Sequence, residues 1–254
     1  MLAAIDIGNS NVSLAIHDGK DWIHFWRYPT IRDESPFFYS LRIRDHLFEH
    51  DIKVENIKKV VLSSVVPPLT PAFHQILPEL FDASLVTVGP TIFPKLSLKI
   101  DNPNEIGSDL IANAVAAHTI YKKDCIVVDF GTALTFTTVT KKGEVLGVAI
   151  APGLKTAISA LFSKTAQLPE VPLELPTTPV GKNTIHAIQS GILNGYVGLV
   201  KHMLTAIRTE VGEHYIAVAT GGLSSILHPL RKEFVEIDVE LTMNGLKIIG
   251  ESVE

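Results

Sequence analysis

Two acidic residues, each followed two positions later by a glycine, are well suited to hold charged ligands. Asp6 stands in the stretch IDIGNSN at 5–11, and Asp129 stands in VVDFGTALTF at 127–136. A tight turn at a glycine exposes consecutive backbone N–H groups that can cradle phosphate oxygens. A carboxylate beside such a turn repels phosphate, so it acts through a bound cation, typically Mg²⁺. Either stretch alone is a weak signal, because an Asp-x-Gly turn is common.

The two acidic turns occupy matching places in two similar stretches of chain. Asp6 and Asp129 lie about half the chain length apart, and each ends an apolar run rich in residues that favour strands. Alternating apolar residues follow each turn, and a second turn comes at Gly19 or Gly143. The repetition predicts two three-strand segments in an internally duplicated protein. The alternative is two unrelated segments with ordinary turns.

A third stretch, ATGGL at 219–223, follows a predicted strand and precedes a predicted helix. Its paired glycines, Gly221 and Gly222, allow a flat adenine or ribose to lie against the backbone. A Gly-Gly pair is usually only a turn, so the information lies in the order of the three motifs. With the two acidic turns facing each other across a cleft, this order predicts a clamp on a polyphosphate.

Asp109 stands at the beginning of a predicted alanine-rich helix that ends near Lys122 and Lys123. Either Ser108 or Asp109 can serve simply as the N-cap of that helix. A carboxylate held in this way can also accept the proton of an alcohol that attacks a phosphoryl group. The local sequence leaves both interpretations open.

Gly191, Gly195 and Gly198 lie on roughly one face of a helix predicted to begin at Thr184. Small residues at this spacing let another helix approach closely. The pattern predicts a tight helix crossing, either within the chain or across a subunit interface.

Composition narrows the class of protein. The chain has 254 residues, 46% of them hydrophobic, and a net charge of -5. It has no cluster of basic residues of the kind that binds nucleic acid, and no apolar run near the length of a membrane helix. The N-terminus lacks the pattern of a signal peptide, and Cys125, the single cysteine, is expected to be buried and inert. We therefore expect a cytoplasmic protein that binds neither nucleic acid nor membranes.

Seven stretches together carry a resemblance to a known family. They are IDIGNSN at 5–11, SSVVPPLT at 63–70, DNPNEIGSD at 101–109, VVDFGTALTF at 127–136, GVAIAPGL at 147–154, GKNTIHAIQSGILNGYVGLV at 181–200 and ATGGL at 219–223. In this order they are distributed along nearly the whole chain. The sequence resembles the type III pantothenate kinases, which belong to the superfamily of sugar kinases, hsp70 and actin.

The resemblance implies a fold and an activity. The fold is α/β, with two duplicated ribonuclease-H-like domains, at 1–117 and 118–254, and ATP in the cleft between them. The activity is phosphorylation of the primary hydroxyl of pantothenate, the first step towards coenzyme A. The implied cofactors are ATP, Mg²⁺ and a monovalent cation, either K⁺ or NH₄⁺. The implied assembly is a homodimer.

The resemblance also assigns roles to individual residues. Asp109 takes the place of the general base, Asp129 helps to bind the monovalent cation, and Asp6 holds Mg²⁺. The nucleotide is bound by Asp6, Gly8, Asn9, Ser10, Asn11, Thr132, Gly221 and Gly222. The acceptor substrate is contacted by Ile100, Gly107, Ser108, Asp109, Leu110 and Thr184.

Several of these positions depart from the family pattern. Leu110 stands where the family has an arginine that pairs with the pantothenate carboxylate, and Ile100 stands where a tyrosine is common. Ser10 replaces a threonine, and Thr137 stands where an aspartate is frequent. Two alternatives therefore remain: a weakly catalytic nucleotide-binding relative with a regulatory role, or a kinase of the same fold that acts on another small alcohol. If the chain uses pantothenate, the sequence predicts weak turnover that Leu110→Arg improves, with Lys99 and Lys182 as candidates to replace the arginine.

Overall fold

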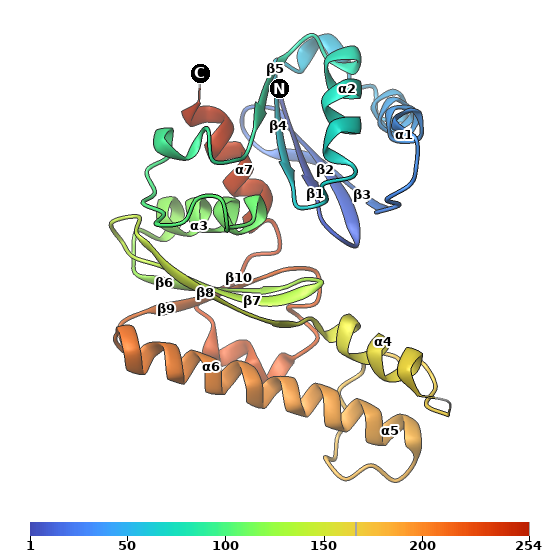
Figure 1. Ribbon diagram of the computed structural model, residues 1–254, viewed down its shortest axis with the longest axis vertical. Helices are drawn as coiled ribbons and strands as arrows, with labels where there is room; N and C mark the ends of the chain where they lie inside the picture. The colour runs from blue at the N-terminus through green and yellow to red at the C-terminus, as the bar shows by residue number, and fades with distance from the viewer. Residues whose placement is uncertain (166, 254) are drawn as a thin grey trace. The chain divides into compact units, whose positions relative to one another are not determined.

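The computed structural model describes residues 1–165 and 167–253. The chain is an α/β protein of two compact units (Figure 1). Unit 1 comprises Met1–Ala116 and Leu241–Glu254, and unit 2 comprises Ala117–Glu240. This division differs from the expected domains in one respect, because the C-terminal helix belongs with the N-terminal half.

Unit 1 is built on a five-stranded mixed sheet in the order β3-β2-β1-β4-β5. Its strands are β1 (Leu2–Ile7), β2 (Asn11–His17), β3 (Trp22–Pro29), β4 (Lys59–Ser64) and β5 (Ser84–Thr87). The first three strands form an antiparallel meander, and β4 and β5 run parallel to β1. The acidic turn at the end of β1 therefore lies beside the end of β4.

Helices cover both faces of this sheet. They are α1 (Pro36–Glu49), α2 (Thr70–Leu80), α3 (Ser108–Tyr121) and α7 (Leu241–Ser252), with short 3-10 turns at Val54–Asn56 and Phe93–Lys95. Ala3, Ile5 and Ile7 of β1 pack in one core with α1 and α2. Leu2 and Ala4 pack in a second core with α3 and α7. Because side chains alternate along a strand, Asp6 lies on the α3 and α7 face of the sheet.

Close packing explains why α7 belongs to unit 1. Gly245 of α7 lies so near the carbonyl of Ala112 in α3 that a side chain at position 245 would overlap it. The Thr242 hydroxyl donates a hydrogen bond to Asn113 Oδ1 over 2.8 Å. Lys59 Nζ of β4 donates to the backbone carbonyl of Gly250 over 2.6 Å. These contacts fix the last helix against β4 and α3, far away in sequence.

Unit 2 repeats the topology of unit 1. Its sheet has the order β10-β9-β6-β7-β8. The strands are β6 (Cys125–Phe130), β7 (Ala133–Val139), β8 (Val145–Pro152), β9 (Ile216–Thr220) and β10 (Glu236–Ile237). Again the first three form an antiparallel meander, and the last two run parallel to its first strand. The internal duplication predicted from the two acidic turns is confirmed.

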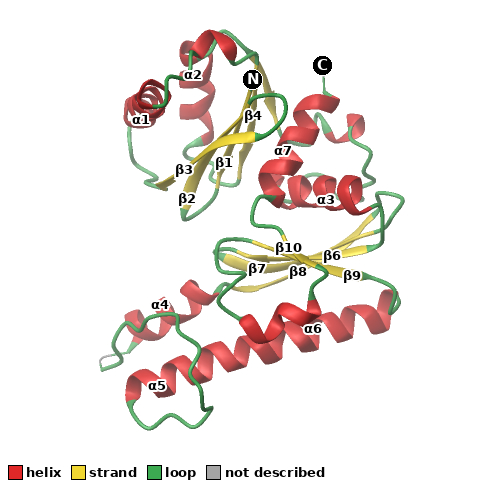
Figure 2. Ribbon diagram, turned by 180° about the vertical axis from the view of Figure 1, so that it is seen from behind, coloured by secondary structure: helices red, strands yellow, loops and turns green. Residues whose placement is uncertain are grey.

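The helices of unit 2 are α4 (Leu154–Lys164), α5 (Thr184–Gln189) and α6 (Gly195–Val211), and a π-helical turn at Ser190–Asn194 joins α5 to α6. Helix α6 runs along one face of the sheet (Figure 2), and its Tyr196, Val200 and Leu204 are buried in the core there. Asn183 caps α5, because its side chain accepts a hydrogen bond from the backbone N–H of His186. The helix thus begins at Thr184, as the sequence predicted, with Asn183 as its N-cap.

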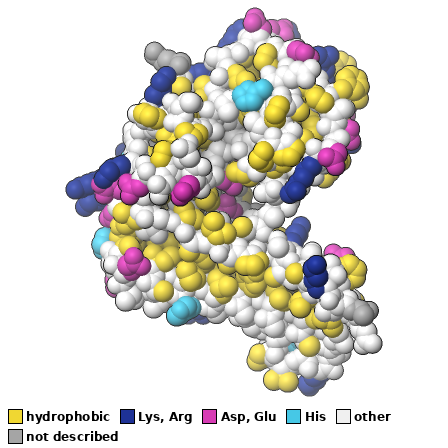
Figure 3. All heavy atoms as spheres, viewed as in Figure 1, with side chains coloured by type: hydrophobic (Ala, Val, Ile, Leu, Met, Phe, Trp, Pro, Cys, Tyr) yellow, Lys and Arg dark blue, Asp and Glu magenta, His cyan; other side chains and the backbone are white. Residues whose placement is uncertain are grey.

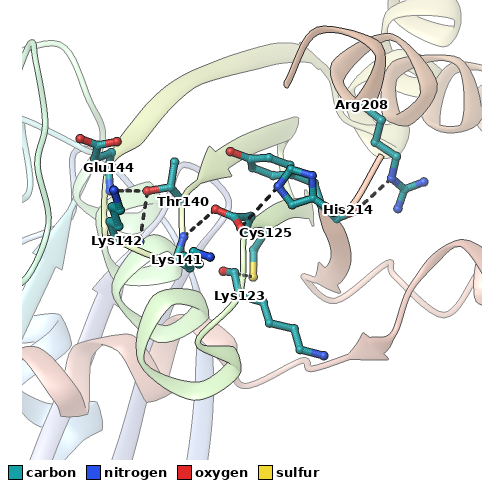
Figure 4. Close-up of polar contacts among 10 residues, drawn as sticks. Lys123, Cys125, Thr140, Lys141, Lys142, Glu144, Arg208 and His214 are labelled. Carbon is teal, nitrogen blue, oxygen red and sulfur yellow. Dashed lines mark hydrogen bonds and ion pairs between the residues drawn. The ribbon is translucent and has the colours of Figure 1, made fainter. Parts of the chain in front are cut away.

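Polar contacts hold the turn between β7 and β8 and the segment before β6 (Figure 4). Thr140 Oγ1 accepts hydrogen bonds from the backbone N–H groups of Lys142 and Glu144, at 3.2 and 3.1 Å. The thiol of Cys125 is buried and donates to the carbonyl of Lys123. Burial raises the pKa of this thiol to about 12. It is therefore protonated at neutral pH and unreactive, as the sequence predicted.

Across the described parts of the chain, no helix is long and apolar enough to span a membrane.

Candidate functional site

Asp6 is held at the end of β1 by its neighbour on β4. The register places Asp6 opposite Ser63, and the Ser63 hydroxyl donates to Asp6 Oδ1 over 2.8 Å. Ser63 Oγ also contacts Ser108 Oγ at 2.9 Å, and Ser108 Oγ accepts from the backbone N–H of Ser64 at 3.0 Å. One chain of hydrogen bonds therefore joins the acidic turn of unit 1 to the first residue of α3. Asp6 and Ser108, both predicted site residues, are brought together.

The turn after Asp6 is fixed by its own backbone and by the end of β3. The N–H of Gly8 donates to the carbonyl of Asn11 over 2.9 Å. Thr30 donates twice, from its hydroxyl to the carbonyl of Gly8 and from its N–H to the carbonyl of Ser10. The side chains of Asn9, Ser10 and Asn11 are exposed. A rigid turn with exposed polar side chains suits the binding of an anion.

The carboxylate of Asp109 lies at the start of α3, one residue after Ser108. Its Oδ1 accepts the backbone N–H of Leu110 over 2.8 Å. A side-chain carbon added at Gly107 would lie 2.5 Å from the same oxygen, so the glycine makes room for the carboxylate. Burial, acting against these hydrogen bonds, raises the pKa of Asp109. A carboxylate with a raised pKa is a stronger proton acceptor once ionised.

A pocket of about 550 Å³ opens in unit 1 beside this helix start. Gly107 and Ser108 line it together with the end of β4 and the beginning of α2. Glu105 is the one charged side chain in its lining among the described residues. Leu110 is buried and does not line this pocket, and Ile100 packs beside the α3 and α7 core. Gly107, Ser108 and Asp109 therefore lie together at this helix start. Ile100 and Leu110, the two apolar residues that depart from the family pattern, do not line the pocket.

Asp129 is the counterpart of Asp6 in unit 2. It is the penultimate residue of β6 and lies opposite Thr135 of β7 and Thr220 of β9. Gly221 follows Thr220 with a φ of 89°, and a side-chain carbon there would lie 2.6 Å from Asp129 Oδ1. Only glycine adopts this backbone readily and leaves room for the carboxylate. Gly222 is exposed, and the segment after it forms turns and a 3-10 helix at His228–Glu233 rather than the predicted α-helix.

The turn carrying Thr132 is supported by the first residues of α4. The carbonyl of Thr132 accepts the backbone N–H of Gly153 over 3.0 Å and the hydroxyl of Thr156 over 2.7 Å. A side chain at Gly153 would overlap the carbonyl of Gly131. The Tyr196 hydroxyl of α6 donates to the carbonyl of Pro152 and so fixes the junction between β8 and α4. The second acidic turn is therefore as rigidly held as the first.

Thr184 lies elsewhere in unit 2, at a pocket of about 610 Å³. The pocket lies between the end of α4 and the helix that runs through α5 and the π-helical turn. Leu161, Leu168 and Ile188 supply apolar walls, and Lys182 is its one charged side chain among the described residues. A π-helical turn beside a pocket is a frequent feature of functional sites.

Comparison with known proteins decides the family. The sequence profile of the type III pantothenate kinases matches residues 2–206. The chain belongs to the type III pantothenate kinase family. A type III pantothenate kinase from Geotalea daltonii is 40% identical over 249 residues, which cover 98% of this chain and 97% of the relative. The corresponding protein from Citrifermentans bemidjiense is 41% identical, with 98% of both chains covered.

Solved structures agree with the type III pantothenate kinase assignment at the level of the fold. A Campylobacter jejuni protein assigned to the Baf family of transcriptional activators matches with a TM-score of 0.62 and 20% identity, covering 97% of this chain and 96% of the other. The activator of 2-hydroxyisocaproyl-CoA dehydratase from Clostridium difficile matches with a TM-score of 0.57 and 12% identity, covering 99% and 95%. Both likenesses concern the fold alone. The predicted α/β fold of two duplicated halves is confirmed.

Kinases of this family use ATP with a divalent metal and act on a small molecule. In unit 1 the carboxylate of Asp6 at a phosphate-type turn fits such a metal. The described residues contain no group of three His, Cys, Asp or Glu side chains that could hold a metal by themselves. An ion with one protein carboxylate, nucleotide phosphates and water as ligands is the arrangement typical of Mg²⁺.

Two supporting residues were not given roles from the sequence. Ser63 lies in SSVVPPLT, and nothing in this local sequence links it to Asp6. Gly153 follows Pro152, and a Pro-Gly pair by itself indicates no more than a turn. Their roles depend on contacts with Asp6 and with Gly131, which are distant in sequence. The register of strands that are distant in sequence was needed to find them.

Proposed function

We propose that the protein transfers the γ-phosphoryl group of ATP to the primary hydroxyl of pantothenate and forms 4′-phosphopantothenate. Curated type III pantothenate kinases at 40–41% identity over 98% of the chain support this activity. The structural observation that carries it is the hydrogen-bonded chain from Asp6 through Ser63 to Ser108, beside Asp109. These hydrogen bonds hold a phosphate-type turn and a partly buried carboxylate within one compact unit. Phosphoryl transfer needs that kind of positioning more than it needs covalent chemistry.

On the nucleotide side, we assign Asp6 to Mg²⁺ and the turn through Gly8, Asn9, Ser10 and Asn11 to phosphate. The exposed polar side chains of this turn and its fixed backbone support the assignment. In unit 2 we assign Thr132, Gly221 and Gly222 to the nucleotide. The divalent ion, when bound, supplies positive charge that offsets the charge of the phosphates as the γ-phosphoryl group leaves.

On the acceptor side, we assign Asp109 as the general base. Its ionised carboxylate accepts the proton of the substrate hydroxyl as that oxygen attacks phosphorus. Gly107 and Ser108, which line the pocket beside it, and Thr184 are assigned to the acceptor substrate. Ile100 and Leu110 were placed with this group by resemblance. Leu110 is buried and Ile100 is partly buried against the α3 and α7 core, and both positions favour a role in packing.

We further propose that two copies associate through the helix that contains Gly191, Gly195 and Gly198. Nothing lies within 4 Å of a side-chain carbon built at any of the three, so this face is not used for packing in the described chain. Hydrophobic side chains also gather on the surface of unit 2 in Figure 3, and Leu146 and Ile150 of β8 are 50% and 69% exposed. They alternate with Ala149 and Ala151, which pack in the core with α6, so they mark a second surface on the opposite face of the sheet rather than the glycine-bearing one. Exposed apolar surface of this kind marks interaction sites.

A second candidate function is a nucleotide-binding relative that has a regulatory role. Leu110 favours it, because an apolar side chain at this position gives no partner to a substrate carboxylate. A third is a kinase acting on a small alcohol without a carboxylate. An assay of ADP release with pantothenate and a panel of small alcohols separates the three. Release with pantothenate confirms the proposal, release with another alcohol supports the third candidate, and nucleotide binding without release supports the second.

A further inference from the structure

Two buried threonine hydroxyls in unit 2 have no hydrogen-bond partner among the described residues. They are Thr135 Oγ1 on β7 and Thr220 Oγ1 on β9. The two side chains are 8% and 1% exposed. Buried polar atoms in folded proteins are almost always paired, and an exception points to a water, an ion or a functional role.

Both threonines stand directly opposite one carboxylate. Asp129 of β6 pairs in register with Thr135 on one side and with Thr220 on the other. Residues that pair across neighbouring strands carry their side chains on the same face of the sheet. Three oxygen-bearing side chains therefore form a row at the end of β6. The glycine at position 221, which follows Thr220, leaves the space that the carboxylate of Asp129 occupies.

In the equivalent row of unit 1, a hydroxyl does donate a hydrogen bond to the central carboxylate. There Asp6 pairs in register with Ser13 and Ser63. Ser63 donates to Asp6 Oδ1 over 2.8 Å, which is what a hydroxyl beside a carboxylate ordinarily does. In unit 2 neither flanking hydroxyl makes such a bond. The corresponding rows of the two units thus differ in their hydrogen bonding.

A cation accounts for the difference. An ion between the three side chains takes carboxylate and hydroxyl oxygens as ligands, so the hydroxyls do not need to donate to Asp129. Hard oxygen donors suit alkali and alkaline-earth ions rather than zinc or copper. The row carries one negative charge, and no three His, Cys, Asp or Glu side chains of the described chain could hold a metal. One charge and two neutral hydroxyls match a monovalent ion better than a divalent one.

We propose that Thr135 and Thr220 complete a monovalent-cation site with Asp129 at the end of β6. The ion is K⁺ or one of similar size, and the two hydroxyls supply the ligands that select it. This inference extends the proposed kinase function, and it rests on the expectation from the family resemblance that Asp129 binds a monovalent cation. The two threonines are an addition to that assignment.

The test compares the melting temperature in potassium chloride with that in tetramethylammonium chloride at equal ionic strength, without nucleotide. A specific ion that binds the folded state raises the melting temperature, whereas general salt effects cancel in the difference. We expect the native protein to melt higher in potassium. Thr220→Val and Thr135→Val should lose most of this difference, or need about tenfold more potassium for half of it. The matched control is Thr137→Val, a buried residue on the same strand and face but opposite Val127.

The valine variants remain informative whatever their stability. Removing an unpaired buried hydroxyl without other consequence leaves stability unchanged or raises it in both salts. Such a result, with the potassium difference intact, would overturn the site, as would a native protein indifferent to potassium. Direct binding of Tl⁺, followed by its NMR signal, provides a second readout that a poorly folded variant cannot mimic. Pantothenate-dependent ADP release in the native protein is measured separately, so failure of the cation site leaves the kinase function standing.

Discussion

Ser63 joins the carboxylate of Asp6 to the first residue of α3, with 2.8 Å to Asp6 Oδ1 and 2.9 Å to Ser108 Oγ. The hydroxyl is fully buried, so both partners depend on it for a hydrogen bond that water does not replace. Neither partner moves independently of the other while this bond is present. One small side chain therefore links the phosphate turn to the start of the helix that carries Asp109.

We expect Ser63→Ala to lower kcat/KM for MgATP by roughly tenfold while the protein still folds. The variant removes one hydrogen bond from Asp6 Oδ1 and one from Ser108 Oγ, a loss of about 1–3 kcal/mol. Steady-state kinetics with varied Mg²⁺ provide the measurement. Ser84→Ala, an exposed serine that bonds the carbonyl of Lys58, serves as the matched control. Unchanged kinetics in both variants would mean that Ser63 has no part in positioning Asp6.

Asp109→Asn should reduce kcat by about 10²–10⁴-fold, because the amide cannot accept the substrate proton. Nucleotide binding should persist. The rate of the native protein should fall with decreasing pH through a pKa above the ordinary carboxyl range, since burial raises the pKa of Asp109. A pH–rate profile on kcat/KM for the acceptor measures this. An acid limb in the ordinary carboxyl range, or a fully active variant, would remove Asp109 from the role of base.

The raised pKa of Asp109 also determines the direction in which protein stability changes with pH. The folded protein holds the Asp109 proton more tightly than the unfolded chain, so its contribution is present at low pH and is lost as pH rises through the raised pKa. The asparagine variant keeps the acceptor for the Leu110 N–H without the buried charge. It should therefore melt at least as high as the native protein at neutral pH, so loss of turnover would not reflect unfolding.

Asp6→Asn and Asp129→Asn should each abolish ATP-dependent turnover and leave the fold intact. Each carboxylate needs its charge to hold a cation near phosphate, and neither contributes to the apolar cores. Turnover is measured at limiting Mg²⁺ for the first variant and at limiting K⁺ for the second, with circular dichroism as the control for folding. Near-native turnover at a limiting cation would contradict the assigned role of that residue.

Gly195→Leu should convert a dimer into a monomer without loss of fold. A side-chain carbon at this position meets nothing within 4 Å, so the substitution is tolerated in an isolated chain. Leucine would keep two copies of the helix apart. Sedimentation at micromolar concentration measures the change, with Thr209→Leu, an exposed residue further along α6, as the control. A native protein that is monomeric, or a dimer that survives Gly195→Leu, would exclude this interface.

Local patterns in the sequence were enough to predict the two acidic turns, the six strands of the two meanders and the duplication. Hydrophobic alternation and turn residues are signals that extend over only a few positions, so they can be recognised in the sequence without knowledge of distant contacts. The place of α7 could not be predicted, because it depends on Gly245 meeting Ala112 across a large separation in sequence. The roles of Ser63, Thr135 and Thr220 depend on strand register, which only the folded sheets define.

Leu110→Arg tests how the acceptor is held. The sequence predicted that an arginine here would improve use of pantothenate. The structure places Leu110 in the first turn of α3 with 9% of its surface exposed, away from the lining of the pocket beside Gly107. An arginine would have to bury its charge, which is strongly unfavourable without a partner.

We therefore expect Leu110→Arg to lower the melting temperature and to give no gain in kcat/KM for pantothenate. The carboxylate of the acceptor then needs another cation, and Lys182, in the pocket beside Thr184, is the candidate that the structure supports. Kinetics and thermal melts on the native protein, Leu110→Arg and Lys182→Gln decide between the two positions. A stable Leu110→Arg protein with improved kcat/KM would place residue 110 in the acceptor pocket. A raised KM for pantothenate in Lys182→Gln alone would assign the carboxylate to Lys182.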